Sequence, residues 1–209
     1  MTPSRFSASR VMTQMDRESE LQLVGRLQTG DPAAFDAVYA AFNGRLYNFL
    51  ARLSNRRDVA EDLLEETWLR LVKHARRLRP DTRLGPWLFT VARHVHASYC
   101  RSRLLEDSHA SGLMGLWPQG RLEPSPFEVV EASEIERRVA RALGSLPLAH
   151  REALLLVTVE GLRHSEAAEI CGVTAEAMRQ RVSRARALLA RRLAEGEVPI
   201  LASLKEITT

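Results

Sequence analysis

The densest group of side chains that could do chemistry is a set of arginines near the C-terminal end. Residues 174–192 contain six arginines and one acidic residue. A guanidinium group can donate two parallel hydrogen bonds to a phosphate or to the major-groove edge of guanine. Between these arginines runs an apolar stripe at helical spacing, formed by Met178, Val182, Ala185 and Leu189. We therefore predict a helix that buries one face and offers donors to DNA with the other.

The residues just before this helix predict a helix-turn-helix. Ala168 is small enough for a close helix crossing, and Gly172 stands where the chain must turn and tolerates a left-handed backbone. Val173 is then expected to point inward, and the Thr174 hydroxyl can cap the next helix. In such a motif the second helix enters the major groove. Any helical hairpin with well-placed Ala and Gly would share part of this pattern, so the arginine-rich outer face is what favours DNA binding.

Two further charged stretches lie in the first half of the chain. Residues 76–103 contain seven arginines and one acid, Asp81, whereas residues 58–66 contain five acids and no base. Basic and acidic surfaces on one chain indicate two kinds of partner. Only Lys73 and Lys205 are lysines, a preference that a GC-rich coding bias would explain equally well.

The sequence gives little support for a metal site or a catalytic site. His96 and Cys100 would share a helix face, but His94 lies roughly 160° from His96 around the helix, and a structural zinc site needs four ligands. No glycine-rich phosphate loop, Gly-x-Ser-x-Gly or His-Glu-x-x-His motif is present. We expect no metal, no cofactor, no small-molecule substrate and no enzymatic activity.

Size and composition favour one large domain or two small ones without a membrane span. The chain has 209 residues and a net charge of +4, and 45% of its residues are hydrophobic. Its longest apolar stretch, residues 154–159, is far too short to cross a bilayer, and no secretory leader opens the chain. We expect a cytoplasmic protein, with Cys100 and Cys171 not joined in a disulfide.

The first half of the chain predicts a helical bundle. A short helix over residues 18–27 is followed by Asp31-Pro32, a capping acid and a first-turn proline that start the next helix. A third helix over residues 59–78 carries its acids in its first turns, where they complement the helix dipole. A fourth helix is expected over residues 86–104. The expected core comprises Phe35, Val38, Tyr39, Phe42, Leu46, Phe49, Leu50, Leu64, Trp68, Leu71, Val72, Leu88, Val91, Ala92, Val95 and Tyr99.

The resulting fold class is all-α, with two helical modules joined by a flexible linker rich in Ser, Gly and Pro. Further helices are expected over residues 128–144 and 148–159, ahead of the helix-turn-helix. The predicted boundaries are a disordered extension over 1–16, a first module over 17–104, a linker over 105–130, a second module over 131–195 and a tail over 196–209. Met1, Met12 and Met15 are the possible start residues.

Three motifs together resemble the extracytoplasmic-function (ECF) group of bacterial sigma-70-type factors. The stretch 60–71, AEDLLEETWLRL, is similar to the family's helix that docks on the clamp helices of RNA polymerase. The stretch 86–93, PWLFTVAR, is similar to the helix that melts and recognises the −10 element. Residues 146–186 are similar to the module that recognises the −35 element. The resemblance implies a sigma region 2-like first module and a region 4-like second module.

The resemblance also assigns partners and site residues. It implies binding to core RNA polymerase through the beta-prime clamp helices and the beta flap, binding to promoter DNA, and control by an anti-sigma factor. The expected polymerase contacts are Glu61, Asp62, Glu65 and Glu66. The expected −10 contacts are Arg79, Asp81, Thr82, Arg83, Arg93, His94 and Arg101. The expected −35 contacts are Thr174, Glu176, Arg179, Gln180, Ser183, Arg184 and Arg186.

Several positions depart from the family pattern. Glutamine is usual where Glu65 stands, asparagine where His94 stands, aspartate where Ser98 stands, and an aromatic in the loop where Leu84 stands. A serine usually begins the first motif helix where this chain has Arg163, so we expect that cap to be lost or shifted. Two alternatives stay open from the sequence: a stand-alone helix-turn-helix regulator, and a sigma mimic that sequesters an anti-sigma factor.

Overall fold

A computed structural model describes residues 17–111 and 134–195, without the side chains of 106–111. These residues contain helices and no strand, which confirms the all-α prediction for the described chain. They form two compact units, one holding residues 17–50 and 58–110 and the other holding residues 51–57 and 134–195. Each is described by itself. The extension 1–16, the tail 196–209 and residues 112–133 of the expected linker region lie outside the described residues.

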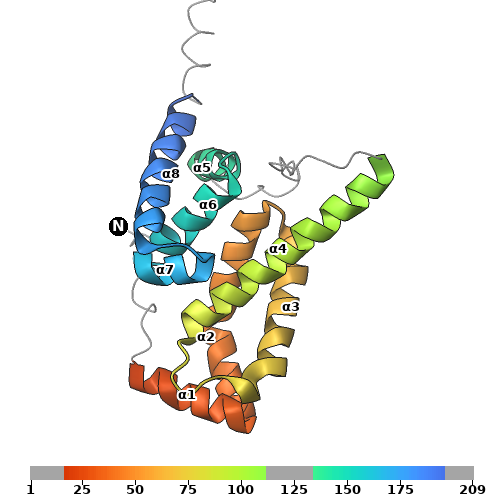
Figure 1. Cartoon of the computed structure of the whole chain (residues 1–209), viewed down its shortest axis with the longest axis vertical. Coiled ribbons are helices and arrows are strands. Elements are labelled where there is room, and N and C mark those ends of the chain that lie inside the picture. Colours follow the sequence, from red (N-terminus) through yellow and green to blue (C-terminus); the bar gives the residue numbers. More distant parts are fainter. Residues whose placement is uncertain (1–16, 112–133, 196–209) are drawn as a thin grey trace, which may run out of the picture. The chain divides into compact units, whose positions relative to one another are not determined.

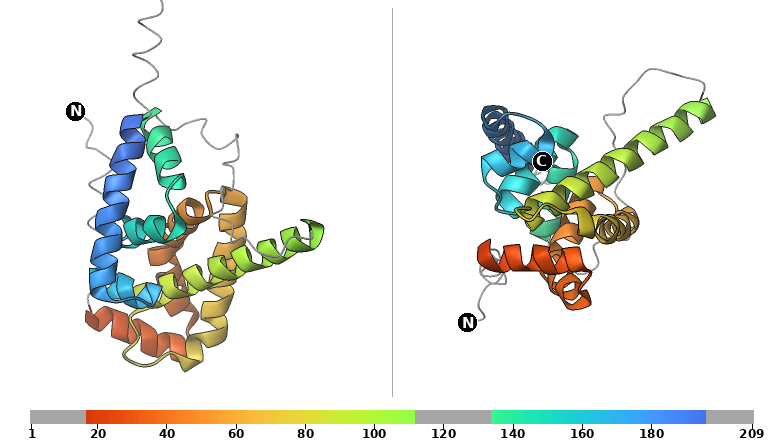
Figure 2. Two further views of the ribbon diagram at one scale, coloured as in Figure 1. Left: turned by 45° about the horizontal axis from the view of Figure 1, so that its top comes forward. Right: turned by 60° about the horizontal axis from the view of Figure 1, so that its bottom comes forward.

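The first unit is built from four helices. They are α1 (Arg17–Thr29), α2 (Pro32–Ser54), α3 (Arg57–His74) and α4 (Leu84–Ser111), and a short 3-10 turn, η2 (Ala75–Arg77), follows α3. The last turn of α2 and the first residue of α3 are grouped with the second unit. α2 and α3 lie side by side, α4 crosses them, and α1 lies across one end of the bundle (Figures 1 and 2). This arrangement brings α1 next to the segment between η2 and α4.

The start of α2 follows the predicted capping chemistry. One carboxylate oxygen of Asp31 accepts the Ala33 N–H at 2.9 Å, and the other pairs with the Arg26 guanidinium at 2.7 Å. The hydrogen bond from Arg26, and then that from Ala33, holds the pKa of Asp31 below its usual value. Asp31 therefore both caps α2 and joins it to α1.

The core of the first unit lies between α2 and α4. Leu46, Phe49, Leu88 and Phe89 are at most 1% exposed, and the Phe49 and Phe89 rings meet edge to face with centroids 5.3 Å apart. The guanidinium of Arg45 stacks over the Phe89 ring at 5.6 Å. Of the predicted core, Val91 and Tyr99 are only half-buried. Phe89 and His96 are also buried on α4 and were not predicted.

Four other core predictions in α2 and α3 are wrong. Tyr39 is 42% exposed, Val72 is 60% exposed, and Phe35 and Leu64 are only half-buried. Tyr39 lies against Trp68 at the edge of the bundle, with ring centroids 4.9 Å apart. The face of α3 that is buried instead carries small and polar residues that a count of large apolar residues overlooks, among them Ala60 and Thr67. That face comprises Val59, Ala60, Leu63, Thr67, Trp68 and Leu71.

α4 is longer at both ends than predicted. It begins at Leu84, because the Glu20 carboxylate accepts the Leu84 N–H at 2.7 Å and Pro86 falls in the first turn, where a missing N–H costs nothing. It runs on to Ser111, so residues 105–111, predicted as the start of the linker, are helical. Between Pro86 and Gly112 the sequence contains no glycine or proline that would favour an end to the helix.

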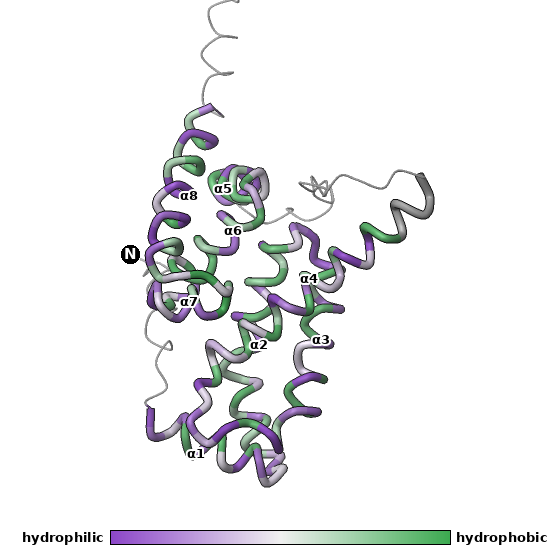
Figure 3. The backbone as a smooth tube through the Cα atoms, viewed as in Figure 1, coloured by the Kyte–Doolittle hydropathy of each residue, from purple (hydrophilic) through white to green (hydrophobic). Residues whose placement is uncertain are grey.

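The second unit contains α5 (Glu134–Gly144), α6 (Leu148–Leu154), α7 (His164–Cys171) and α8 (Ala175–Glu195). The helix predicted from residue 128 is seen only from Glu134, because 128–133 lie outside the described residues. The helix predicted over 148–159 changes character at Leu155: a π-helical turn, η3 (Leu155–Val159), ends with Glu160 N–H donating to Leu155 O. Hydrophobic and hydrophilic stretches alternate along the helices (Figure 3).

A buried arginine closes the end of α5. Arg151, 6% exposed, donates from Nε to the Leu143 carbonyl and from Nη2 to the Leu146 carbonyl, both at 3.1 Å, and also to the Gly144 carbonyl. Burial lowers the pKa of its guanidinium. Carbonyls at a helix end lack partners within the helix, so Arg151 satisfies the acceptors that α5 leaves open.

Candidate functional site

The acidic residues of α3 lie on one exposed face. Glu61, Asp62 and Glu65 are exposed, and Leu69 and Val72, 56% and 60% exposed, continue the same face along the helix. We call these five residues the α3 outer face. Glu66 stands apart from them, because it is half-buried and its carboxylate pairs with Arg70 Nε at 2.8 Å. Three carboxylates followed by two apolar side chains suit a partner helix that is both basic and apolar.

The 79–83 loop joins η2 to α4 and carries four predicted DNA contacts. The side chains of Arg79, Asp81 and Arg83 are exposed, and Arg79 Nε pairs with Asp81 Oδ1 at 3.2 Å. The Thr82 N–H donates to the Arg79 carbonyl at 2.9 Å, which makes the loop a tight turn. The backbone is therefore ordered while its charged side chains project into solvent.

Beside this loop lies a hollow of about 190 Å³, below the roughly 300–1,000 Å³ of typical small-molecule pockets. Of the predicted site residues, Arg79 and Thr82 line it. The sequence did not indicate its other walls, because η2, the loop and α4 meet only in the folded unit. Those walls are His74, Arg77, Leu78 and Trp87. An aromatic ring beside several cations is suited to stack a base and pair with its phosphate.

The predicted contacts on α4 are only partly exposed. His94 and Arg101 are exposed and seven residues apart, so they share a face, while Arg93 is half-buried. Arg101 Nη2 donates to Ser98 Oγ at 3.0 Å. Ser98 is the residue that stands at the position of the expected aspartate. Leu84, expected as a loop residue, is instead the fully buried first residue of α4. Its departure from the usual aromatic therefore concerns the core of the unit.

The turn of the helix-turn-helix forms as predicted. Gly172 has a φ of 66°, the Val173 N–H donates to the Ala168 carbonyl at 3.0 Å, and Thr174 Oγ1 accepts the Ala177 N–H at 3.1 Å. Ala168 is 3% exposed. Val173, expected to point inward, is only half-buried. Local chemistry in this stretch fixes the angle at which α8 follows α7.

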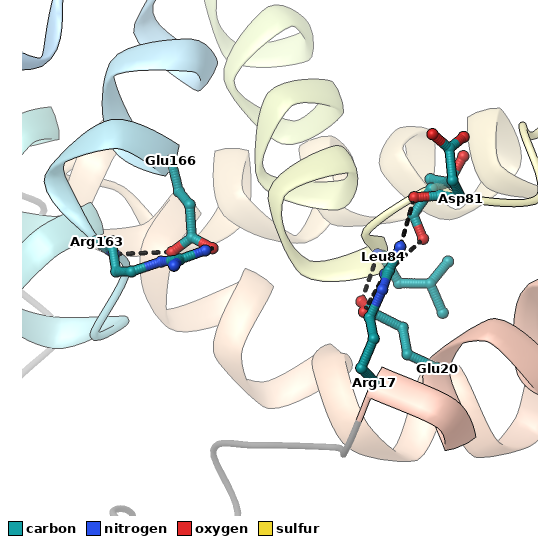
Figure 4. Close-up of polar contacts among 7 residues, drawn as sticks. Arg17, Glu20, Asp81, Leu84, Arg163 and Glu166 are labelled. Atoms are coloured by element: carbon teal, nitrogen blue, oxygen red, sulfur yellow. Dashed lines mark hydrogen bonds and ion pairs between the residues drawn. The ribbon is translucent and has the colours of Figure 1, made fainter.

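The cap of α7 is shifted from one side chain to another, as expected from Arg163. Glu166 Oε2 accepts the Arg163 N–H at 2.8 Å, and Glu166 Oε1 pairs with the Arg163 guanidinium at 3.0 Å (Figure 4). Glu166 is 5% exposed. This is the half of a capping box that the third helical residue supplies, so the helix keeps a cap without serine.

The predicted contacts on α8, together with Thr174 just before the helix, share one solvent-facing surface, which we call the recognition face. Its seven residues are exposed, whereas Met178, Val182 and Ala185 are buried against the other helices. They are Thr174, Glu176, Arg179, Gln180, Ser183, Arg184 and Arg186.

Two donors of the recognition face are held by Glu176. Arg179 donates to Glu176 Oε2 from Nη2 at 2.6 Å and from Nε at 2.9 Å, and Gln180 Nε2 donates to Oε1 at 3.4 Å. These bonds, led by the one from Arg179, hold the pKa of the Glu176 carboxyl below its usual value. In the DNA-free protein Arg179 therefore already has an acceptor, which a base edge would have to replace.

One residue beside this face was not predicted. His150 on α6 has a buried Nδ1 with no hydrogen-bond partner, and burial lowers the pKa of its imidazole. The positive charges of Arg181 and Arg184 lower it further. His150 thus lies close enough to α8 for its protonation to be opposed by two of the arginines there.

Metal and membrane sites are absent from the described residues. Within residues 17–111 and 134–195, no group of three or more His, Cys, Asp or Glu is arranged to hold a metal ion. The Cys100 thiol lies 3.7 Å from His96 Nε2, and the Cys171 thiol donates to Glu152 at 3.4 Å. In the same part of the chain, no helix is long and apolar enough to cross a membrane.

Comparison with known proteins matches both units to sigma-factor regions. Residues 38–104 match the model for sigma-70 region 2, and residues 136–189 match that for sigma-70 region 4. The ECF RNA polymerase sigma factor EcfG of Rhodopseudomonas palustris (strain TIE-1) is 36% identical over 141 residues, covering 68% of this chain and 75% of that protein. The RNA polymerase sigma factor CarQ of Myxococcus xanthus is 30% identical over 176 residues, covering 84% and 98%.

The chain belongs to the ECF group of sigma-70-type sigma factors. A solved relative, the sigma factor RpoE of Bartonella quintana in complex with the anti-sigma factor NepR, is 28% identical, with a TM-score of 0.63 over 77% of this chain and 96% of that one. Membership makes this sigma factor a transcription initiation factor that binds core RNA polymerase and promoter DNA.

Proposed function

We propose that this sigma factor docks on the clamp helices of the beta-prime subunit through the α3 outer face. The observation that carries the proposal is the juxtaposition of exposed Glu61, Asp62 and Glu65 with exposed Leu69 and Val72 on one helix. Carboxylates attract and orient a basic partner. Burial of the exposed apolar side chains against that partner stabilises the complex. Glu66 lies beside this face, where its carboxylate pairs with Arg70, and is proposed to contribute less to the contact.

The 79–83 loop and α4 handle the −10 element in this proposal. Arg79, Asp81, Thr82 and Arg83 contact the melted strand together with Arg93, His94 and Arg101 of α4. An unpaired base enters the hollow beside the loop and stacks on Trp87, while Arg77 and Arg79 pair with phosphates. Unpairing is the costly step, and a strand already melted by polymerase makes it easier.

The recognition face handles the −35 element. α8 lies in the major groove, where Glu176, Arg179, Gln180, Ser183 and Arg184 meet base edges, while Arg186 and the Thr174 end of the helix hold phosphate. The beta flap supports this second unit on polymerase. Because the two units are linked, neither DNA contact need be tight alone.

An anti-sigma factor holds the protein inactive until it is needed. Support comes from the solved relative of Bartonella quintana, which is described in complex with an anti-sigma factor. Leu69 and Val72 give an inhibitor an apolar surface to cover in competition with polymerase. The protein works in the cytoplasm, beside its polymerase, and has no catalytic activity of its own.

Run-off transcription tests the proposal. Core RNA polymerase and the full chain are combined on a promoter that the wild-type holoenzyme has selected from a randomised DNA pool. Asp62→Lys with Glu65→Lys should abolish the transcript and core binding, whereas the control pair Glu18→Lys with Asp36→Lys, also exposed acids, should not. A transcript untouched by the first pair would rule out the docking assignment.

The same experiment separates the two alternatives. Selection of DNA without core polymerase, and no change when it is added, would indicate a stand-alone regulator. Absence of any selected DNA, with or without core polymerase, would indicate a sigma mimic and would remove the proposed function.

A further inference from the structure

The 79–83 loop is held at both ends by side chains of α1. At the entrance, Gln28 Nε2 donates to the Leu78 carbonyl at 2.6 Å. At the exit, Arg17 Nη2 donates to the Asp81 carbonyl at 2.7 Å, and Glu20 Oε1 accepts the Leu84 N–H at 2.7 Å (Figure 4). The bonded partners are 50 to 64 residues apart in the sequence, so α1 acts on the loop only in the folded unit.

The two exit residues also hold each other. Arg17 Nη1 pairs with Glu20 Oε2 at 2.8 Å and donates to the Thr82 carbonyl at 3.4 Å. The side chain of Glu20 is 14% exposed and that of Arg17 is 45% exposed, so the pair is partly shielded from water. A planar guanidinium bonded to one carboxylate and two carbonyls is fixed in direction as well as in place.

The four bonds described above from α1 to the loop go to backbone atoms. They do not use the side chains of Arg79 and Thr82, which line the hollow. A recognition loop whose backbone is held in advance loses less conformational entropy on binding and discriminates better between ligands.

We propose that Arg17, Glu20 and Gln28 are positioning residues that set selectivity for the −10 element by fixing the loop backbone. The inference rests on the proposed role of the loop in −10 recognition. It assigns to α1, which carries none of the expected DNA contacts, a share in promoter choice. Docking on polymerase lies on the α3 outer face, and −35 recognition lies in the other unit. Loosening α1 should therefore change −10 selectivity and leave those two steps in place.

The test uses full-length protein in holoenzyme with core polymerase. The probe is the promoter selected by the wild type, re-made as a pool in which only the −10 element is randomised. Arg17→Ala and Glu20→Ala should each lower enrichment of the preferred −10 sequence roughly tenfold, because each removes a charge-assisted hydrogen bond. Gln28→Leu should lower it about threefold, because it removes a neutral one. Core binding and affinity for the −35 duplex should stay within twofold of wild type.

Matched variants separate positioning from general support. Arg26→Ala also removes an α1 ion pair, that with Asp31, but does not touch the loop and should keep full selectivity. Glu20→Gln keeps an oxygen for the Leu84 N–H and should recover most of what Glu20→Ala loses. Gln28→Leu removes a single hydrogen bond, so it keeps the test open if the Arg17 and Glu20 variants do not fold.

The outcomes distinguish this inference from the proposed function. If the wild type selects no −10 sequence, the proposed role of the loop fails. If the wild type selects one and the three α1 variants select it equally well, α1 only supports the fold and the inference is overturned. Equal losses in Arg26→Ala and Arg17→Ala would overturn it as well, because selectivity would then follow stability alone.

Discussion

At the scale of single residues, hydrogen bonds within the recognition face must be exchanged for hydrogen bonds to DNA, and this exchange limits the binding free energy. Arg179 and Gln180 both donate to Glu176 in the DNA-free protein. A base edge that replaces this carboxylate must offer two well-placed acceptors, which guanine does through O6 and N7. The carboxylate that is released can in turn accept from cytosine N4. An exposed pair of this kind contributes little to stability, so breaking it costs little.

Replacing Arg179 should weaken and broaden −35 recognition. If Arg179 makes a bidentate base contact, Arg179→Ala should cost about 1–3 kcal/mol, or roughly five- to 150-fold in affinity. Holoenzyme titration on promoter DNA with single-base changes in the −35 element would measure this. Arg192→Ala, which removes an exposed pair with Glu195 farther along α8, serves as the control. Unchanged affinity in Arg179→Ala would take this residue off the list of base contacts.

Acid should remove the Glu176 ion pair in a defined direction. The pKa of folded Glu176 lies below its usual value of 4.5, so the stabilisation is fully present above that value and disappears as the pH falls through the lowered folded pKa. Urea denaturation at neutral pH should therefore show Glu176→Gln slightly less stable than wild type. The two proteins should become equally stable once the pH is well below the lowered folded pKa of Glu176. A difference that persists in acid would mean that the pair does not exist in solution.

At the scale of elements, α3 has a buried face and an outer face, and neighbouring residues in the sequence can belong to different faces. Leu71 is fully buried, and its neighbour Val72 is 60% exposed. Both are apolar, so hydropathy assigns both to the core. The difference between a packing residue and a surface residue arises from how α3 sits on α2 and α4.

A pair of substitutions should separate these faces. Leu71→Ala should cost about 2–5 kcal/mol of unfolding free energy, because it leaves a cavity in a packed core. Val72→Asn should change that free energy by no more than about 0.5 kcal/mol, because the side chain is largely in water. The same Val72→Asn protein should bind core polymerase more weakly if the α3 outer face is the docking site. Urea denaturation and core-binding titration give the two readouts, and strong destabilisation by Val72→Asn would contradict the exposed placement.

At the scale of the whole molecule, the proposed promoter contacts are divided between two units. The residues proposed for the −10 element lie in the first unit, and those proposed for the −35 element lie in the second. Sites that share no partner are expected to contribute independently to binding free energy. Their linkage in one chain then raises affinity through effective concentration, with no need for direct communication.

Changes in the two units should therefore add. In holoenzyme binding to one promoter, the free-energy cost of Arg101→Ala combined with Arg179→Ala should equal the sum of the single costs within about 0.5 kcal/mol. A double-mutant cycle measured by titration provides the number. Coupling well above that value would indicate that the units respond to each other on DNA.

Short-range chemistry was predictable from the sequence, and long-range placement was not. Gly172 and Thr174 act on neighbours within a few residues, so the turn could be predicted in detail. The start of α4 could not, because its cap comes from Glu20, 64 residues earlier. The hollow beside the 79–83 loop was missed for the same reason. The exposure of Tyr39 and Val72 was missed because hydropathy does not distinguish a core side chain from one kept apolar on the surface.

The placement of the tryptophans has a spectroscopic consequence. Trp68 donates to Asn43 Oδ1 at 3.0 Å and neighbours exposed Tyr39 at the edge of α3, while half-buried Trp87 lines the hollow beside the 79–83 loop. From residue 134 onward the chain has no tryptophan. The third tryptophan, Trp117, lies outside the described residues. With Trp117 replaced by Phe, intrinsic fluorescence of the unlabelled protein should therefore report clamp binding and base capture in the first unit, while duplex binding by α8 stays optically silent. Phe replacements at Trp68 and Trp87 would assign each emission change to its surface.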